Sequence, residues 1–185
     1  MKKNIGSVLA LYPSPAVVIG ATAEGGKPTW TLVAHVGIIG HDRILVSLAS
    51  AHYINGYIKA NGKFSVNIVD EKILPKADYA GSVSGAKTDK SGLFEYEKGE
   101  NGTPMISDSP LVLECSVKDT YITPGFESFI ASIDGTYVEE NCLNSDGKID
   151  YSVLKPVLFD FPAYEYLRTG DIIGKCLTLK EDTED

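Results

Sequence analysis

The chain has 185 residues, enough for one domain with a sizeable core, and its hydrophobic and charged fractions of 43% and 23% are typical of a globular protein. A net charge of -8 without any basic run argues against nucleic acid or an anionic membrane as a partner, because phosphate binding needs clustered Lys and Arg. Three widely spaced cysteines give neither a disulfide framework nor a zinc site, and we expect a reducing, cytoplasmic location.

The N-terminal segment loosely imitates a signal peptide. A pair of lysines precedes two short apolar stretches, but Pro13 and Pro15 stand between the stretches and are incompatible with a short apolar helix. No apolar run reaches the roughly 18 residues that a membrane span needs. We therefore expect a lead-in segment that feeds a first strand, and no membrane association.

Three strands are predicted next. Residues 16–22 are apolar and β-branched, and residues 24–28 have the Gly-rich chemistry of a hairpin loop. A strand pattern resumes from Trp30 to Ile39, ends in the turn 40–42, and is followed by a third strand from Arg43 to Ala49. The regular exchange of strand and turn predicts an antiparallel meander.

A helix is predicted after the third strand. Ser50 is a favourable N-cap, and Tyr53, Tyr57 and Ile58 recur at helical spacing. Gly62 then provides the left-handed residue that commonly ends a helix.

Alternation returns in residues 63–69 and predicts another strand. Asp70 caps a second helical stretch, which we expect Pro75 to interrupt and Gly81 to end. Residues 81–92 form a polar, Gly-rich loop.

The second half of the chain continues the β pattern. Strands are predicted at 111–117 and 129–138, a turn at 144–147, a short helix at 151–154, and a closing strand rich in aromatic residues beyond Pro156. Short, closely spaced strands with interposed helices predict a mainly β fold, a Greek-key-like antiparallel barrel with helical insertions. The strand–helix alternation of a doubly wound sheet is not sustained.

The common catalytic and nucleotide-binding motifs are all incomplete in this sequence. The loop 81–88 resembles a P-loop, but Ala86 replaces its second glycine and no amphipathic helix follows. The dinucleotide fingerprint and the serine nucleophile motif are missing, and residues 144–150 lack the spaced acids of a calcium loop. The three histidines are not at metal-ligand spacing. We predict no metal site and no catalytic acid–base residue.

The junction between the third strand and the first helix, residues 47–53, carries a local binding signal. A helix that begins near Ala51 presents free N–H groups, with the helix dipole behind them, to a phosphate. An ordinary capped helix end is the alternative.

Short motifs follow one another in one order and at one spacing over residues 10–176: Ser50-Ala51-His52-Tyr53, Ile58, Gly62-Lys63-Phe64-Ser65-Val66-Asn67, Tyr79-Ala80-Gly81, Ser84-Gly85 through Asp89-Lys90, Asp146-Gly147-Lys148-Ile149-Asp150, Leu154-Lys155-Pro156, Tyr166 and Gly174-Lys175. Each motif alone is weakly specific. Their joint order resembles the flavin reductase-like family, and most closely its flavoredoxin branch.

The resemblance implies a split β-barrel with FMN bound at the interface of a homodimer. The strand–helix junction then holds the flavin phosphate, and the loop that includes Ser84 closes over the flavin, which carries the redox chemistry. The positive partners of the phosphate are expected to be His52, Lys87 and Lys90. Replacing either lysine with Ala is expected to weaken FMN binding by about 1.5–3 kcal/mol. The residues expected to bind the cofactor are Trp30, Thr31, Leu32, Val33, Ala34, Ser47, Leu48, Ala49, His52, Tyr53, Ile54, Asn67, Ser84, Lys87, Lys90, Phe126 and Tyr166.

Several positions depart from the family pattern. Thr29 stands where relatives often carry Asn, His35 where they carry Trp, and Ile54 where Thr is frequent. Phe126 lies near a frequent His, and Lys87 holds a position often taken by Arg, which keeps the charge but loses the bidentate fork. These differences are compatible with phosphate binding and leave the redox partner open.

Two functions from different classes follow from the resemblance. The protein is either an enzyme that reduces flavin with NAD(P)H, or a carrier whose FMN passes electrons to another redox protein; a flavin-binding module without turnover is a third reading. Because a dinucleotide site is missing, any nicotinamide is expected to rest on exposed flavin beside Phe126 and Tyr166, with little difference between NADH and NADPH. We expect one domain over residues 1–176 and an acidic tail over 177–185.

Overall fold

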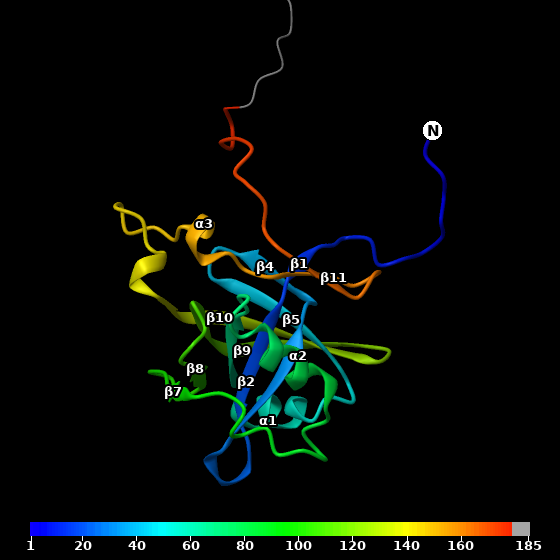
Figure 1. Cartoon of the computed structure of the whole chain (residues 1–185). Helices are drawn as coiled ribbons and strands as arrows, with labels where there is room; N and C mark the ends of the chain where they lie inside the picture. Colours follow the sequence, from blue (N-terminus) through cyan, green and yellow to red (C-terminus); the bar gives the residue numbers. More distant parts are fainter. Residues whose placement is uncertain (179–185) are drawn as a thin grey trace, which may run out of the picture.

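The computed structural model describes residues 1–178 and shows a mainly β molecule (Figure 1). The predicted acidic tail, residues 177–185, lies outside this range apart from its first two residues. One antiparallel sheet has the strand order β3-β2-β6-β9-β10-β5-β4. Its strands are β2 (Val17–Thr22), β3 (Pro28–Val33), β4 (Val36–Gly40), β5 (Arg43–Ala49), β6 (Lys63–Ile68), β9 (Leu111–Thr123) and β10 (Phe126–Val138).

Two small sheets and three α-helices complete the described part of the chain. Strands β1 (Ser14–Pro15), β11 (Leu158–Asp160) and β12 (Glu165–Leu167) pair with one another, as do β7 (Tyr96–Lys98) and β8 (Pro104–Ile106). The helices are α1 (Ile54–Asn61), α2 (Leu74–Ser82) and α3 (Tyr151–Leu154), with short 3-10 turns at η1 (Glu24–Gly26) and η2 (Glu140–Cys142). The mainly β, antiparallel fold class predicted from the sequence is confirmed.

The two hairpins of the predicted meander are present, but its continuous middle strand is not. The strand expected from Trp30 to Ile39 is two strands, β3 and β4, which lie at opposite edges of the large sheet. Strand β5 pairs on one side with β4, as the meander requires, and on its other side with β10, from the second half of the chain. Because only Ala34 and His35 join β3 to β4, the two sheet edges must approach each other there, and the sheet curls into a barrel.

The helix boundaries differ from the sequence prediction at three points. The first helix begins at Ile54 and not near Ala51, and Ser50 is not its N-cap: the Ser50 amide donates to the Gly125 carbonyl, 2.9 Å away, and ties the segment to the β9–β10 hairpin. The second helix is not interrupted by Pro75, which sits in its first turn, where a missing N–H costs no helical hydrogen bond. Gly81 lies inside that helix, which ends at Ser82.

Other elements match the prediction closely. Strand β5, helix α3 and the turn at 144–147 have the predicted positions, and Gly62 ends α1 in the left-handed region at φ 67. Strands β9 and β10 are longer than predicted, at 13 residues each, because the antiparallel pairing between them continues as far as Thr123 and Phe126.

Two apolar clusters pack on the two faces of the sheet. The interior cluster contains Phe64, Phe129 and, from β2, Val17 and Ile19. The exterior cluster contains Val18, Trp30 and the Ala77 and Ala80 side chains of α2, so it fixes α2 against the outer surface of β3. A Cβ at Gly20 would lie 2.4 Å from Cζ3 of Trp30, so only glycine leaves room for the indole ring.

Candidate functional site

Two adjoining cavities lie beside β3 and the end of α2; the first extends to β5 and the β11–β12 hairpin, and the second to the start of α1. We call the first, of about 620 Å³, the large pocket and the second, of about 190 Å³, the polar pocket. His52, Gly81 and Ser82 line both cavities and mark where they join.

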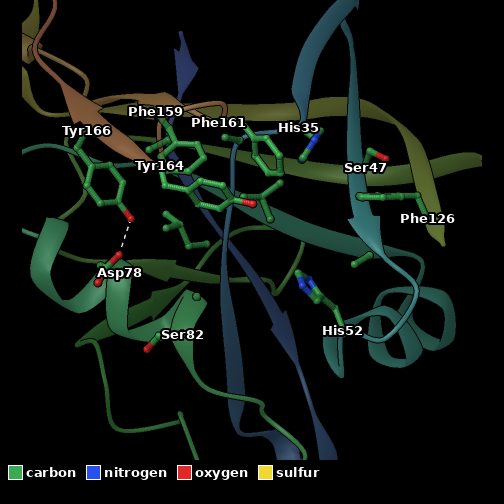
Figure 2. A pocket seen from close by; sticks show the side chains of 16 residues that line it. His35, Ser47, His52, Asp78, Ser82, Phe126, Phe159, Phe161, Tyr164 and Tyr166 are labelled. Atoms are coloured by element: carbon green, nitrogen blue, oxygen red, sulfur yellow. Dashed lines mark hydrogen bonds between the residues drawn. The ribbon is translucent and has the colours of Figure 1, made fainter. Parts of the chain in front are cut away.

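Three structural layers enclose the large pocket (Figure 2). Leu32, Val33 and Ala34 follow β3 across one wall, and Ser47 and Ala49 of β5 continue it. The end of α2 contributes the helix side, and aromatic residues of the β11–β12 hairpin cover the opposite side. The pocket is therefore a largely apolar slot with a few polar groups, which is the usual character of a small-molecule site.

Aromatic rings converge at one end of the large pocket. The ring centroid of His35 lies 5.2 Å from that of Phe161 and 5.5 Å from that of Phe126. Tyr164 continues the group, with its centroid 5.1 Å from that of Phe161. Burial lowers the pKa of His35, so its imidazole is neutral near pH 7 and has one N–H donor and one acceptor.

The aromatic hairpin is fastened to α2 and to the segment before it. The Tyr166 hydroxyl donates to Oδ1 of Asp78 at 2.6 Å, and Arg168 forms a two-point ion pair with Glu71 at 2.7 and 2.8 Å. Burial and the hydrogen bond with Asp78 both raise the pKa of Tyr166, so the hydroxyl keeps its proton throughout the physiological range. These contacts hold the aromatic wall over the pocket.

A buried lysine supplies the charge of the polar pocket. Lys90 is only 6% exposed, and its ammonium donates to the carbonyls of Trp30 and Ala80 at 3.0 and 2.6 Å. Because an ammonium has three donors, one remains for a ligand. Burial lowers the pKa of Lys90, an effect that an anion in the pocket would oppose.

The first turn of α1 faces the same cavity. Ala51, His52, Tyr53 and Ile54 line the polar pocket. The His52 amide donates to Ala49 and the Asn55 amide to His52, whereas the amides of Tyr53 and Ile54 have no acceptor within residues 1–178. Free N–H groups at the positive end of a helix are anion donors, and the buried ammonium lies in the same pocket.

His52 occupies the junction of the two pockets. Its Nδ1 atom is buried and has no hydrogen-bond partner among the described residues. Burial, followed by the positive charge of Lys90, lowers the pKa of His52. The imidazole is therefore neutral near pH 7 and has an unused polar atom.

Fourteen of the seventeen residues that the sequence assigned to a cofactor line these two pockets. Those in the large pocket are Leu32, Val33, Ala34, Ser47, Ala49, Phe126 and Tyr166; those in the polar pocket are Trp30, Thr31, Tyr53, Ile54, Ser84 and Lys90; and His52 lines both. Trp30 offers its carbonyl to Lys90 rather than its ring to the pocket, since the indole packs in the exterior cluster.

The remaining three residues lie outside both pockets. Leu48 is 1% exposed and points into the barrel, because alternation along β5 turns it away from Ser47 and Ala49. The Asn67 amide donates to the Val18 carbonyl and its Oδ1 accepts from the Ile106 amide, so it joins β8 to the sheet. Lys87 is exposed and lines a neighbouring surface cavity.

Sequence reasoning missed part of the site. Asp78, Ser82, Phe159, Phe161 and Tyr164 line the large pocket but belong to no recognised local motif. The available signal was the density of aromatic residues in the predicted closing strand, which is high for an exposed edge. Their position depends on a long-range contact, because the hairpin folds back over α2 and is held there by the Tyr166–Asp78 hydrogen bond (Figure 2).

Comparisons with known proteins identify relatives of this fold. The profile of the flavin reductase-like domain matches residues 9–167. A flavoredoxin from Methanosarcina acetivorans is 36% identical, with 96% of each chain covered and a TM-score of 0.90. The flavoredoxin of Desulfovibrio vulgaris (Miyazaki F) is 30% identical over 96% of this chain and 98% of its own, with a TM-score of 0.89.

More distant structures share the fold alone. An FMN-binding protein from Thermus thermophilus is 18% identical over 91% of this chain and 94% of its own, with a TM-score of 0.76. A search of curated protein sequences gives no match.

Proposed function

This chain belongs to the flavin reductase-like domain family, and we propose that it binds FMN and transfers electrons through it. The observation that carries the proposal is the junction of an apolar slot with a smaller cationic pocket at His52, Gly81 and Ser82. A flavin mononucleotide has the matching form, a flat apolar ring system joined by a polar chain to a phosphate. The names of the two flavoredoxins support a flavin as the ligand, and the Thermus protein, which shares the fold, is named for binding FMN.

The residues of the polar pocket fit a phosphate. The third proton of Lys90, the unpaired amides of Tyr53 and Ile54, and the unpartnered Nδ1 of His52 are unused hydrogen-bonding groups. Unused polar groups inside a protein are costly, and an oxygen-rich anion would satisfy several of them together. FMN is therefore favoured over riboflavin, which lacks the phosphate.

The residues of the large pocket would bind and orient the ring. Alternating side chains of β3 and β5 supply one apolar face, and the hairpin fastened by Tyr166 shields the slot from water. When bound, FMN supplies the hydride and electron chemistry, as flavins do in other proteins. The chain contributes position, exclusion of water and hydrogen bonds, and we assign no catalytic acid or base to it.

The electron donor separates two versions of this function. In the first, NAD(P)H reduces the flavin, and its nicotinamide rests in the slot beside Phe126 and Tyr166. In the second, the protein is a carrier that exchanges electrons with another redox protein. The large pocket favours the carrier to a limited extent, because no Lys or Arg lines it within the described residues and nothing there would hold a dinucleotide pyrophosphate.

Two further features complete the proposal. We propose a homodimer, in which a second copy covers exposed apolar parts of the sheet and of the terminal segments. We also propose that the protein works in the cytoplasm as a single domain over residues 1–176. None of the helices in residues 1–178 has the length and apolar character required to cross a bilayer.

The spectrum of the purified protein tests the proposal. The protein should be yellow, or turn yellow when FMN is added, and the flavin released by heat should be FMN. Anaerobic addition of NADH and NADPH then separates the versions: bleaching by both at similar rates supports a reductase, and bleaching by dithionite alone supports a carrier. A protein that binds no flavin would refute both.

A further inference from the structure

The aromatic end of the large pocket has a composition that limits what can bind there. We define the aromatic corner as His35, Phe126, Phe161 and Tyr164. These residues come from the β3–β4 link, the start of β10 and the β11–β12 hairpin, and all four line the large pocket (Figure 2). Rings from three separate parts of the chain therefore enclose one end of the site.

The corner suits a flat, uncharged guest. Its neighbouring ring centroids are 5.1 to 5.5 Å apart, the spacing at which aromatic rings attract one another, and a planar molecule offers the same contact. Asp78 is the charged residue of the large pocket within residues 1–178, and it already accepts a hydrogen bond from Tyr166. An anionic guest would meet a carboxylate and no cation, at a substantial desolvation cost.

His35 gives the corner one specific polar contact. Its backbone carbonyl accepts from the Ser47 amide at 2.9 Å, which fixes the position of the residue. No hydrogen bond to another described residue involves its ring nitrogens, so the neutral imidazole has an N–H available for a guest's oxygen.

We propose that the aromatic corner binds an uncharged planar carbonyl compound of the quinone class as the electron acceptor of the flavin, and that the His35 imidazole donates a hydrogen bond to one quinone oxygen. This inference rests on the proposed flavin function. The quinone gains two electrons and two protons and becomes a hydroquinone, and the reduced flavin loses the same two electrons and two protons. NAD(P)H or another two-electron donor then returns the flavin to its reduced form.

Binding to the oxidised, FMN-loaded protein tests the inference without turnover. Naphthoquinone, its sulfonate and naphthalene are titrated separately, and each dissociation constant is read from the change in flavin absorbance. We expect naphthoquinone to bind at least about tenfold more tightly than the sulfonate, because the sulfonate would bring an unpaired charge into the corner. Equal or tighter binding of the sulfonate would overturn the proposal.

Substitution of His35 tests the assigned hydrogen bond. His35→Phe keeps a ring in place and, once the protein is loaded with FMN, should weaken naphthoquinone binding about five- to tenfold, the usual worth of one neutral hydrogen bond, while leaving naphthalene binding unchanged. His41→Phe, on the exposed turn after β4, is the matched control and should change nothing. Unchanged naphthoquinone binding in a folded His35→Phe protein would refute the role of His35.

Two further measurements keep the result interpretable. If His35→Phe fails to fold, Phe161→Leu should weaken naphthoquinone and naphthalene alike, and an unchanged affinity for both would refute the corner as the site. The FMN affinity of every protein is measured first. Failure to bind FMN contradicts the proposed function, whereas normal FMN binding without quinone binding contradicts only this inference.

Discussion

Lys90 and His52 determine the electrostatics of the polar pocket, and they do so in different ways. Lys90 is a buried cation held by two carbonyls, so its charge is present before a ligand arrives. His52 lies beside it as a neutral ring, because burial and the lysine charge both lower the pKa of His52. A phosphate would reverse the second of these effects.

Lys90 should be the main positive partner of the phosphate. Lys90→Ala removes a charge-assisted hydrogen bond, and FMN binding should weaken by about 1.5–3 kcal/mol, with little change for riboflavin. The variant should also unfold at a lower temperature, since the Trp30 and Ala80 carbonyls lose their buried donor. Flavin fluorescence titration gives the affinities.

Lys87→Ala is the matched control, because Lys87 is exposed and lies outside the polar pocket. Its FMN affinity should stay close to that of the unaltered protein. A large loss in Lys87→Ala together with none in Lys90→Ala would place the phosphate in the neighbouring cavity.

FMN binding should take up protons through His52. The pKa of His52 is lowered below its usual value of about 6.5 in the flavin-free protein, and a phosphate dianion beside the ring should raise it, so FMN affinity should increase as the pH falls towards about 6.5. Calorimetry at about pH 6.5, in buffers with different ionisation enthalpies, counts the protons. Riboflavin and the His52→Asn variant should both show no uptake, and equal uptake with riboflavin would exclude this linkage.

His35 and His52, the two histidines of the large pocket, should make the flavin-free protein less stable in mild acid. Burial lowers the pKa values of His35 and His52 in the folded state, so the unfolded chain binds protons more readily. Their contribution to the free energy of unfolding is complete above about pH 6.5, the pKa of histidine in the unfolded chain. It is lost as the pH falls below that value and through the lower pKa values of the folded protein. The free energy of unfolding, measured with denaturant, should therefore decrease as the pH falls from 7 to about 5. This decrease should be smaller in His35→Phe and in His52→Asn.

At the scale of secondary-structure elements, the sequence predicted what local chemistry controls. The turn at 40–42 and the apolar run after it located β5, alternation located β6, and Gly62 marked the end of α1. The sequence did not predict the break between β3 and β4 at residues 34–35, because a two-residue break inside an apolar run carries no turn signal. That break nevertheless sends β4 to the far edge of the sheet. The sequence also did not predict β11–β12 as a wall of the pocket, since that contact depends on Tyr166 reaching Asp78, 88 positions earlier in the chain.

The contact of α2 with β3 should be the element-level constraint on the pockets. An added Cβ at Gly81 would lie 2.9 Å from Cβ of Leu32, so Gly81→Ala should move α2 away from β3 and distort the junction of the two pockets. Overpacking costs about 1–3 kcal/mol, against about 1 kcal/mol gained in helix propensity. We expect weaker FMN binding and a lower or unchanged melting temperature.

Gly56→Ala on α1 is the matched control, because an added Cβ there has no neighbour within 4 Å. It should gain the full helix propensity, up to about 1 kcal/mol, and melt about 2–4 °C higher with normal FMN binding. If both alanine variants behave alike, the close approach of Gly81 to Leu32 does not control the site.

At the scale of the whole molecule, apolar surface is left uncovered in one copy of the chain. Ile38 and Ile39 on the edge strand β4 are 67% and 53% exposed, and Tyr121 and Ile122 at the end of β9 are 63% and 68% exposed. Figure 1 shows both ends of the described chain extending away from the barrel, and Leu11 in the N-terminal segment is 94% exposed. Extended apolar segments and an uncovered sheet edge indicate an interface.

The protein should therefore be a dimer in solution. The chain has a mass of 19.9 kDa, and light scattering coupled to size exclusion should give twice that value. Replacing both Ile38 and Ile39 by Lys should shift the protein towards the monomer, because charged side chains block association at a strand edge. If the unaltered protein stays monomeric with flavin fully bound, the prediction of a dimer is contradicted.

The central claim is that one ligand joins the two pockets, with its ring in the large pocket and its phosphate in the polar pocket. The most direct test is to titrate the flavin-free protein with FMN and with riboflavin, and to compare the two dissociation constants by quenching of flavin fluorescence. FMN should bind at least about tenfold more tightly, since the phosphate engages Lys90 and the free amides of α1. Equal affinities for FMN and riboflavin would show that the polar pocket holds no phosphate and would contradict the account.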